Sequence, residues 1–161
     1  MPIKVGDKLP NATFRVMTSE GPKPRTTDDI FKGKKVALFA VPGAFTPTCS
    51  NLHMPSFLNN AAAFKAKGVD AIAVTGVNDV FVMEAWKKAT GADGKVDFLA
   101  DGNADFAKAI DMTLDASGNG LGIRSKRYSM LVDDGVVKKL NVEDAPGKCD
   151  ISGGQALLGQ I

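Results

Sequence analysis

Residues 41–50, VPGAFTPTCS, place Cys49, one of the two cysteines of the chain, between an apolar stretch and a helical pattern. Thr46 can cap a helix whose first position is Pro47, so that Cys49 falls in the first turn. Unpaired backbone N–H groups and the positive end of the helix dipole favour a thiolate there, and the thiolate is the reactive form of cysteine. The alternative is a small buried hydrophobe, which is the commonest fate of a free cysteine.

Residues 46–49, Thr-Pro-Thr-Cys, have the spacing of a redox Cys-x-x-Cys motif in which threonine replaces the first cysteine. A hydroxyl cannot form a disulfide, so dithiol exchange within this motif is lost. The Thr46 hydroxyl can instead hydrogen-bond a peroxide oxygen next to the Cys49 thiolate. The motif therefore favours a reactive cysteine over a buried one.

The pattern Pro42-x-x-x-Thr46-x-x-Cys49 resembles the active site of the peroxiredoxin family, and the surrounding sequence resembles its type II, or peroxiredoxin 5, branch. The similarity extends along the chain through PIKVGDKLP, FKGKKVALF, GVND and KRYSMLVDDGVVKKLNVE. It implies a thioredoxin-like fold, peroxide reduction by a cysteine thiol without a metal, haem or flavin cofactor, and commonly a homodimer.

The resemblance assigns four residues to the active site. It makes Cys49 the peroxidatic cysteine, Thr46 the hydroxyl donor, Pro42 the shielding proline and Arg127, in KRYSM, the active-site arginine. Arg127 and Ser129 fall on one face of an expected strand, and an arginine on a core-side face needs a polar partner such as a thiolate with peroxide. The alternative for this residue is a position at the solvent edge.

Two further polar residues near these positions are kept out of the catalytic set. Arg124 precedes the strand near a loop, which favours a surface role. His53, four residues after Cys49, could lie on the same helical face but can equally well cap or pack.

The second cysteine, Cys149, lies in APGKCDISGG, a segment rich in proline and glycine after the last expected strand. In the atypical two-cysteine members of the branch the resolving cysteine lies in this loop, so the resemblance implies an intramolecular disulfide between Cys49 and Cys149. The connection is shorter here than in those members. The alternatives are a one-cysteine peroxidase reduced directly by glutathione or glutaredoxin instead of thioredoxin, and a non-enzymatic peroxide sensor or chaperone.

Composition narrows the class of protein. A chain of 161 residues predicts one domain, residues 1–161, and its net charge of +2 comes from interspersed charges that do not suggest nucleic acid binding. No apolar run reaches the length of a membrane helix, and the N-terminus lacks a signal-peptide pattern, so we expect a cytoplasmic protein. One histidine and two distant cysteines make a poor metal site. The single histidine also disfavours a cysteine hydrolase, and Pro55 stands where a cysteine phosphatase needs its arginine.

The elements that must position these residues follow from the hydrophobic pattern. Continuous apolar runs predict buried strands, and periodic runs with caps predict helices. The expected strands are residues 36–41, 69–77 and 96–100, followed by a hairpin around Asp133-Asp134-Gly135; the expected helices are 56–67, one from 80 capped by Asn78 or Asp79, 104–110 capped by Asn103, and 152–160. This order predicts an α/β domain with a central mixed sheet flanked by helices, and it is compatible with a thioredoxin-like fold.

Overall fold

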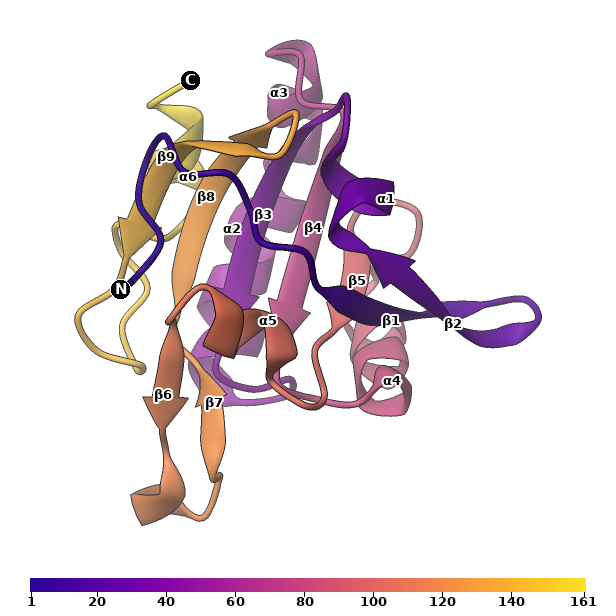
Figure 1. The fold of residues 1–161 in the computed structure, drawn as a ribbon, viewed down its shortest axis with the longest axis vertical. Helices are drawn as coiled ribbons and strands as arrows, with labels where there is room; N and C mark the ends of the chain where they lie inside the picture. Colours follow the sequence, from indigo (N-terminus) through magenta and orange to yellow (C-terminus); the bar gives the residue numbers. More distant parts are fainter.

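A computed structural model describes residues 1–161 and arranges seven strands in one mixed sheet (Figure 1). Their order across the sheet is β2-β1-β5-β4-β3-β8-β9, with the central β3, β4 and β5 parallel and the outer strands antiparallel. A separate two-stranded ribbon, β6–β7, projects from the end of the sheet where β3 finishes (Figure 1). The expected α/β class with a central mixed sheet is confirmed.

The strands of the sheet are β1 (Thr13–Thr18), β2 (Gly21–Thr26), β3 (Lys35–Val41), β4 (Ala71–Gly76), β5 (Asp97–Ala100), β8 (Tyr128–Asp133) and β9 (Val136–Val142), and those of the ribbon are β6 (Thr113–Asp115) and β7 (Ile123–Ser125). The α-helices are α1 (Thr27–Phe31), α2 (Met54–Leu58), α3 (Ala61–Ala66), α4 (Val80–Thr90), α5 (Asp105–Ala109) and α6 (Gly154–Leu158). A π-helical turn, η1 (Cys49–His53), and a short 3-10 turn, η2 (Ser117–Asn119), complete the list. No helix has both the length and the hydropathy that crossing a membrane requires.

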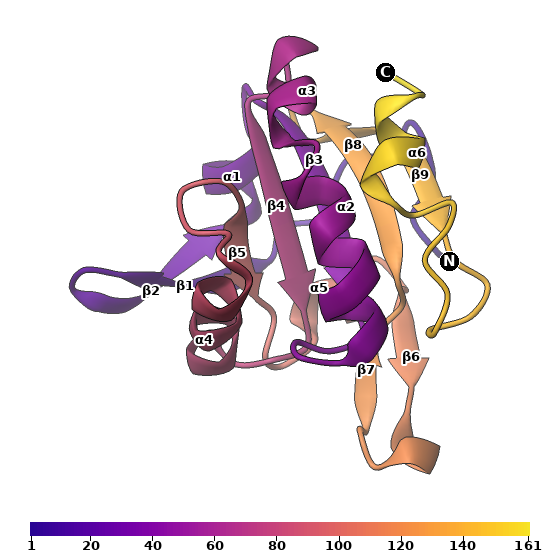
Figure 2. The same ribbon diagram turned by 180° about the vertical axis from the view of Figure 1, so that it is seen from behind.

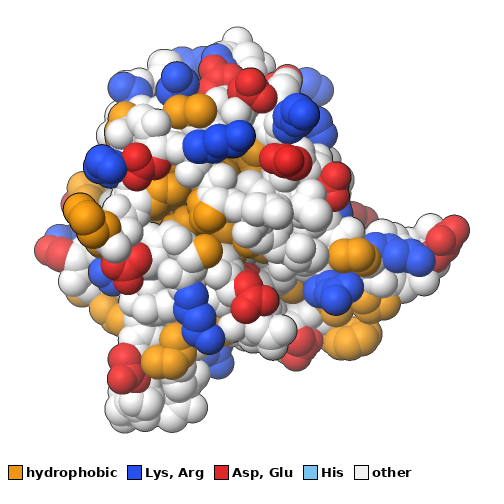
Figure 3. Space-filling view, in the orientation of Figure 1, with side chains coloured by type: hydrophobic (Ala, Val, Ile, Leu, Met, Phe, Trp, Pro, Cys, Tyr) orange, Lys and Arg blue, Asp and Glu red, His pale blue; other side chains and the backbone are white.

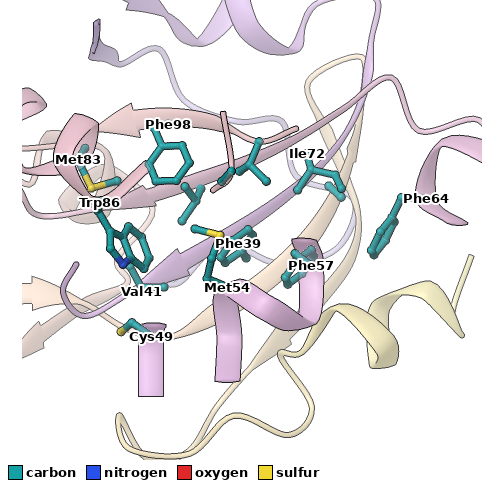
Figure 4. Packing of buried hydrophobic residues seen from close by; sticks show 14 of the residues in the cluster. Phe39, Val41, Cys49, Met54, Phe57, Phe64, Ile72, Met83, Trp86 and Phe98 are labelled. Atoms are coloured by element: carbon teal, nitrogen blue, oxygen red, sulfur yellow. The ribbon is translucent and has the colours of Figure 1, made fainter. Parts of the chain in front are cut away.

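Helices cover both faces of the sheet and enclose one apolar core on each side. On one face lie α2, α3, α4 and α6 (Figure 2), and the core beneath them includes Phe39, Phe57 and Trp86. Figure 4 shows Cys49 at the edge of this core, near Val41 and Trp86. The other face carries α1, α5 and the N-terminal segment. Burial on both faces explains why the central strands are continuous apolar runs.

The three expected central strands and the hairpin are confirmed. The turn between β8 and β9 holds Asp134 at φ 50° and Gly135 at φ 79°. Two successive positive φ values are what a two-residue type I′ turn requires, and aspartate followed by glycine tolerates them. This turn fixes the antiparallel pairing of β8 and β9.

The expected helix over residues 56–67 is wrong in its continuity, because it is interrupted between α2 and α3. The side chain of Asn60 donates to Ser56 O at 2.7 Å, and the backbone N–H of Asn60 turns to Phe57 O instead. A side-chain amide thus takes the carbonyl that the next helical turn would have used. The last helix is also shorter than expected, covering Gly154–Leu158.

One of the two expected helix caps is confirmed, and the other is replaced by a different residue. Asp79 caps α4, accepting from Phe81 N and Val82 N at 2.9 Å, as expected. Asn103 does not cap α5; the Asp101 carboxylate instead accepts from the first helical N–H groups, and burial raises the pKa of this carboxyl.

The strands β1 and β2 were not among the expected elements. The sequence of β2, GPKPRT, contains two prolines, which are compatible only with the edge position that β2 occupies.

On the face seen in Figure 1, basic and acidic side chains are interspersed (Figure 3).

Candidate active site

The site forms where β3 ends and β8 begins. Ala40 on β3 pairs with Tyr128 on β8, so Arg127 lies beside the point at which the chain leaves the sheet. After Val41 the chain passes through a loop and enters helical structure at Pro47, and the π-helical turn η1 starts at Cys49. Antiparallel pairing of β3 with β8 therefore brings Cys49 close to Arg127, which lies 78 positions further along the chain.

Arg127 and Cys49 are in direct contact inside the protein. Arg127 Nη2 donates to Cys49 Sγ at 3.1 Å, and the two residues are 2% and 0% exposed. A guanidinium carries only donors and a positive charge, so the contact places both directly beside this sulfur. Burial away from water strengthens the electrostatic effect of this charge.

His53, which sequence reasoning left out, is part of the same cluster. It is fully buried, and its Nδ1 lies 3.0 Å from Arg127 Nη1 while its Nε2 lies 2.9 Å from Ser152 O. Because arginine can only donate, Nδ1 must accept and Nε2 must carry the proton. Burial, aided by the positive charge of Arg127, lowers the pKa of His53 to about 3, so the ring is neutral.

Cys49 and His53 are the first and last residues of the π-helical turn η1. Met54 N donates to Cys49 O, a bond that spans five residues instead of four. The wider turn leaves Cys49 and His53 facing the same arginine. The spacing of four residues after the cysteine was the one signal in the sequence that pointed to His53.

Thr46 does not form the side-chain cap that the sequence suggested. Its hydroxyl donates to Gly43 O at 2.7 Å, and the helix starts through Ser50 N donating to Thr46 O at 2.9 Å. Because the hydroxyl proton is committed to Gly43, the Thr46 oxygen is left as an acceptor. The loop is thereby closed on itself just before the cysteine.

Pro42 is buried at the start of this loop. Its carbonyl accepts from Arg124 Nη1 at 3.4 Å, and Arg124 is half-buried. Arg124 also donates through Nε to Leu121 O at 2.9 Å, so its side chain links the loop after β3 to the β6–β7 ribbon at the protein surface. A Cβ at Gly43 would stand 3.1 Å from Arg124 Nη1, so the loop backbone and this arginine approach closely.

Cys149 lies in the C-terminal loop, which we define as residues 144–152 between β9 and α6. Its thiol is free and half-buried, and burial raises its pKa. Pro146 O accepts from Arg127 Nε and Nη2 at 3.2 and 3.0 Å, and Gly147 O accepts from Thr48 Oγ1 at 3.1 Å. The loop therefore lies against the start of the cysteine helix, by which we mean the helical segment from Pro47 through η1 and α2, as the yellow segment in Figure 2 shows.

Glu143, directly after β9, binds the other end of the C-terminal loop. Its Oε2 accepts from Asp150 N, Ser152 N and Ser152 Oγ at 2.7, 2.8 and 2.6 Å. Burial acts to raise the pKa of this carboxyl, but the hydrogen bonds from Ser152 and Asp150 outweigh it and lower the pKa. Nothing in the sequence pattern pointed to Glu143 or Ser152.

No group of three or more His, Cys, Asp or Glu side chains is arranged to hold a metal ion.

Comparison with known proteins gives consistent matches. Residues 4–158 match the family model described as Redoxin. The chain is 46% identical over 158 residues to peroxiredoxin-2C of Oryza sativa subsp. japonica, covering 98% of this chain and 97% of that protein. It is 49% identical to the chloroplastic peroxiredoxin-2E of Arabidopsis thaliana over 88% of this chain, but it spans only 62% of that relative's length.

Solved structures agree with this match. Reduced Prx3 in complex with H2O2 from Vibrio vulnificus superposes with a TM-score of 0.93 at 49% identity, covering 98% of each chain. Peroxiredoxin 5 from Alvinella pompejana gives a TM-score of 0.85 at 37% identity, covering 98% of this chain and 96% of that one.

Proposed function

Because this chain belongs to the peroxiredoxin family and shares its thioredoxin-like fold, we propose that it reduces peroxides through the thiol of Cys49. The observation that carries the proposal is the buried contact of 3.1 Å between Arg127 Nη2 and Cys49 Sγ. The arginine supplies positive charge for the thiolate and donors for the oxygen that leaves.

The first step is an in-line displacement at the terminal peroxide oxygen. The Cys49 thiolate forms an S–O bond while the O–O bond breaks, and the second oxygen leaves as hydroxide or alkoxide and takes up a proton. The sulfur is oxidised to a sulfenic acid and the peroxide is reduced to water or an alcohol. Hydrogen peroxide and organic hydroperoxides both fit this chemistry.

Thr46 and Pro42 shape the place where the peroxide binds. The Thr46 oxygen, whose proton is given to Gly43, accepts a hydrogen bond from the peroxide hydroxyl. Pro42, buried at the start of the loop, shields the reacting sulfur from water. Together they orient the peroxide toward Arg127.

We assign the second step to Cys149. Its sulfur attacks the sulfenic sulfur of Cys49, an S–S bond forms, the S–O bond breaks, and the oxygen leaves as water. The contacts of Pro146 and Gly147 with Arg127 and Thr48 support this role because they keep the C-terminal loop against the cysteine helix. A dithiol reductant such as thioredoxin, or glutaredoxin or glutathione, then restores both thiols.

The Cys149→Ser variant tests this second step. One equivalent of hydrogen peroxide should convert the native chain to a species two hydrogens lighter, with no free thiol and full recovery by thioredoxin. Cys149→Ser should instead gain one oxygen, lose thioredoxin-supported turnover and overoxidise more readily. Intact mass and thiol titration measure all three properties.

Other results with Cys149→Ser would support the alternative functions, a one-cysteine peroxidase or a non-enzymatic sensor. Equal turnover of Cys149→Ser with glutathione or glutaredoxin would make the protein a one-cysteine peroxidase and Cys149 a bystander. Sulfenic acid without catalytic turnover in the presence of any thiol would favour a peroxide sensor or chaperone.

We also propose that the protein forms a homodimer through the surface beside the active site. Three large apolar side chains there are more than half exposed: Phe45 at 54%, Leu52 at 55% and Phe81 at 65%. Ala44 N donates to Asn78 Oδ1 at 2.9 Å, which ties the loop that carries Phe45 to the start of α4. Apolar side chains of this size are typical of interface anchors.

Replacing Phe81 with glutamate should disrupt this dimer, because a charge cannot be buried in an apolar contact without a partner. We expect the native chain to sediment as a dimer and Phe81→Glu to dissociate at about tenfold higher concentration or more. The matched control is Val5→Glu, a similar change at an exposed apolar residue near the N-terminus. Equal sedimentation of both variants with the native chain would contradict this interface.

A further inference from the structure

A chain of hydrogen bonds leads from the Cys49 sulfur to the far end of the C-terminal loop. Arg127 Nη2 donates to Cys49 Sγ, and Arg127 Nη1 donates to His53 Nδ1. His53 Nε2 donates to Ser152 O, and Ser152 N and Oγ donate to the Glu143 carboxylate. All five residues are buried, so each of these bonds would be costly to leave unmade.

His53 transmits orientation in this chain and does not transmit a proton. Its Nδ1 can only accept from Arg127, and its Nε2–H points to the Ser152 carbonyl, so both nitrogens are committed. The neutral ring has an acceptor on one side and a donor on the other. A displacement of Ser152 therefore changes the orientation of the ring that Arg127 contacts, and a displacement of Arg127 changes the ring that Ser152 contacts.

The C-terminal loop is held closed by polar contacts more than by apolar burial. Residues 144–148 are exposed, and the loop is fastened at Pro146 and Gly147 on one side of Cys149 and through Glu143 and Ser152 on the other. A segment of this kind can open without exposing the core. Disulfide formation needs such opening, because the two sulfurs must come to about 2 Å while Arg127 lies between Pro146 and Cys49.

We propose that His53 couples the closed state of the C-terminal loop to the placement of Arg127 against Cys49. In the closed state Ser152 O fixes the His53 ring, and the ring fixes Arg127 Nη1, so that Nη2 faces the sulfur. When the loop opens, the ring loses its acceptor and Arg127 is no longer held against Cys49. Opening of the C-terminal loop therefore reaches Arg127 through the His53 ring, and this inference rests on the proposed function.

The coupling makes Glu143 a positioning residue although it contacts neither Cys49 nor Arg127. Glu143→Gln weakens the attachment of Ser152, so it should slow the first oxidation of Cys49 by hydrogen peroxide about tenfold. The rate is measured in a Cys149→Ser background, where only this step occurs. The single tryptophan reports it by fluorescence, since Trp86 Nε1 donates to Ser50 Oγ in the cysteine helix.

Two substitutions of His53 separate its two nitrogens. Asparagine places an oxygen near Nδ1 and keeps the acceptor for Arg127, whereas glutamine places an amide nitrogen near Nε2 and keeps the donor for Ser152. His53→Gln should slow oxidation by about tenfold or more, and His53→Asn should be slowed less. In both variants the further change Glu143→Gln should alter the rate by less than about twofold, because the link is already broken.

A matched control separates the coupling from a simple loss of charge. Asp144→Asn removes a carboxylate from the same loop that is 80% exposed and pairs only with Lys148, at 3.6 Å. Its oxidation rate should stay within about twofold of the parent. Loop opening is measured separately as alkylation of Cys149 in a Cys49→Ser background, which Glu143→Gln should accelerate and Asp144→Asn should not.

Two results would overturn the coupling. The first is an unchanged oxidation rate in Glu143→Gln although Cys149 alkylates faster. The second is equal slowing by Glu143→Gln with and without His53, since the effect would then pass from Pro146 directly to Arg127. If one His53 variant does not fold, the other completes the cycle. Failure of the proposed function looks different, because the Cys149→Ser parent would then form no sulfenic acid.

Discussion

Replacing Cys49 with serine should abolish thiol-dependent peroxide consumption, with a loss of more than about a thousandfold. A serine hydroxyl is almost entirely protonated at neutral pH, and its oxygen cannot be oxidised to the equivalent of a sulfenic acid. The loss is measured as peroxide remaining after incubation with dithiothreitol, which reduces the enzyme whether or not Cys149 takes part.

The fold of Cys49→Ser should survive, which makes the comparison meaningful. The serine oxygen can accept the hydrogen bond from Arg127 Nη2, so the buried guanidinium keeps a partner. Thermal unfolding followed by circular dichroism checks this point. A folded Cys49→Ser protein that still consumes peroxide at a substantial rate would refute the assignment of Cys49.

Replacing Arg127 with glutamine should slow the reaction with peroxide by about a hundredfold or more, through two separable effects. Loss of the positive charge next to the sulfur should slow iodoacetamide alkylation of Cys49 at neutral pH. Loss of the donors should slow peroxide oxidation even at a pH where the thiol is fully ionised. Alkylation and stopped-flow oxidation, each measured against pH, distinguish the two.

Two further arginine variants serve as comparisons. Arg127→Lys keeps the charge but replaces the planar fork that serves Cys49, His53 and Pro146 with a single ammonium, so it should recover the alkylation profile better than the peroxide rate. Arg15→Gln removes an exposed arginine on β1 and should leave both profiles unchanged. If Arg127→Gln matches the native profiles, Arg127 has no part in the reaction.

His53 also bears on how these pH profiles are interpreted. Its pKa of about 3 leaves the ring neutral at every pH where the native fold is assayed, so protonation of this histidine does not contribute to the profiles. Any inflection near neutral pH therefore reports another group.

Local patterns in the sequence were sufficient for the central strands, the β8–β9 turn and the start of the helical segment that carries Cys49. The apolar runs that became β3, β4 and β5 and the Asp134-Gly135 turn were recognisable because strand burial and turn conformation act over a few neighbouring residues. The start of the helix at Pro47 was recognisable for the same reason. The contact of Arg127 with Cys49 was anticipated only through the family motif.

Polar contacts between distant segments were decided by the tertiary structure alone. Whether Asn78 caps α4 or holds the backbone of Ala44 depends on how the loop after β3 packs against α4. Asp101 takes the place of Asn103 at the start of α5, where the N-cap residue Ala104 has a φ of 60° that no propensity in the sequence indicated. At both helix starts more than one Asn or Asp side chain could act as the N-cap by its sequence position, and the packing of the chain decides which one does.

The hydrogen bonds that link Cys49 through Arg127 and His53 to Ser152 were likewise decided by the tertiary structure and not by the local sequence. His53 was ambiguous in the sequence because a histidine on a helix can cap, pack or bind, and its partners lie 74 and 99 residues further along the chain. A π-helical turn, the pairing of β3 with β8 and the hydrogen bonds of Glu143 together place it between Arg127 and Ser152. Sequence periodicity carries no information about these contacts, because each depends on which faces meet after the sheet and its helices have packed.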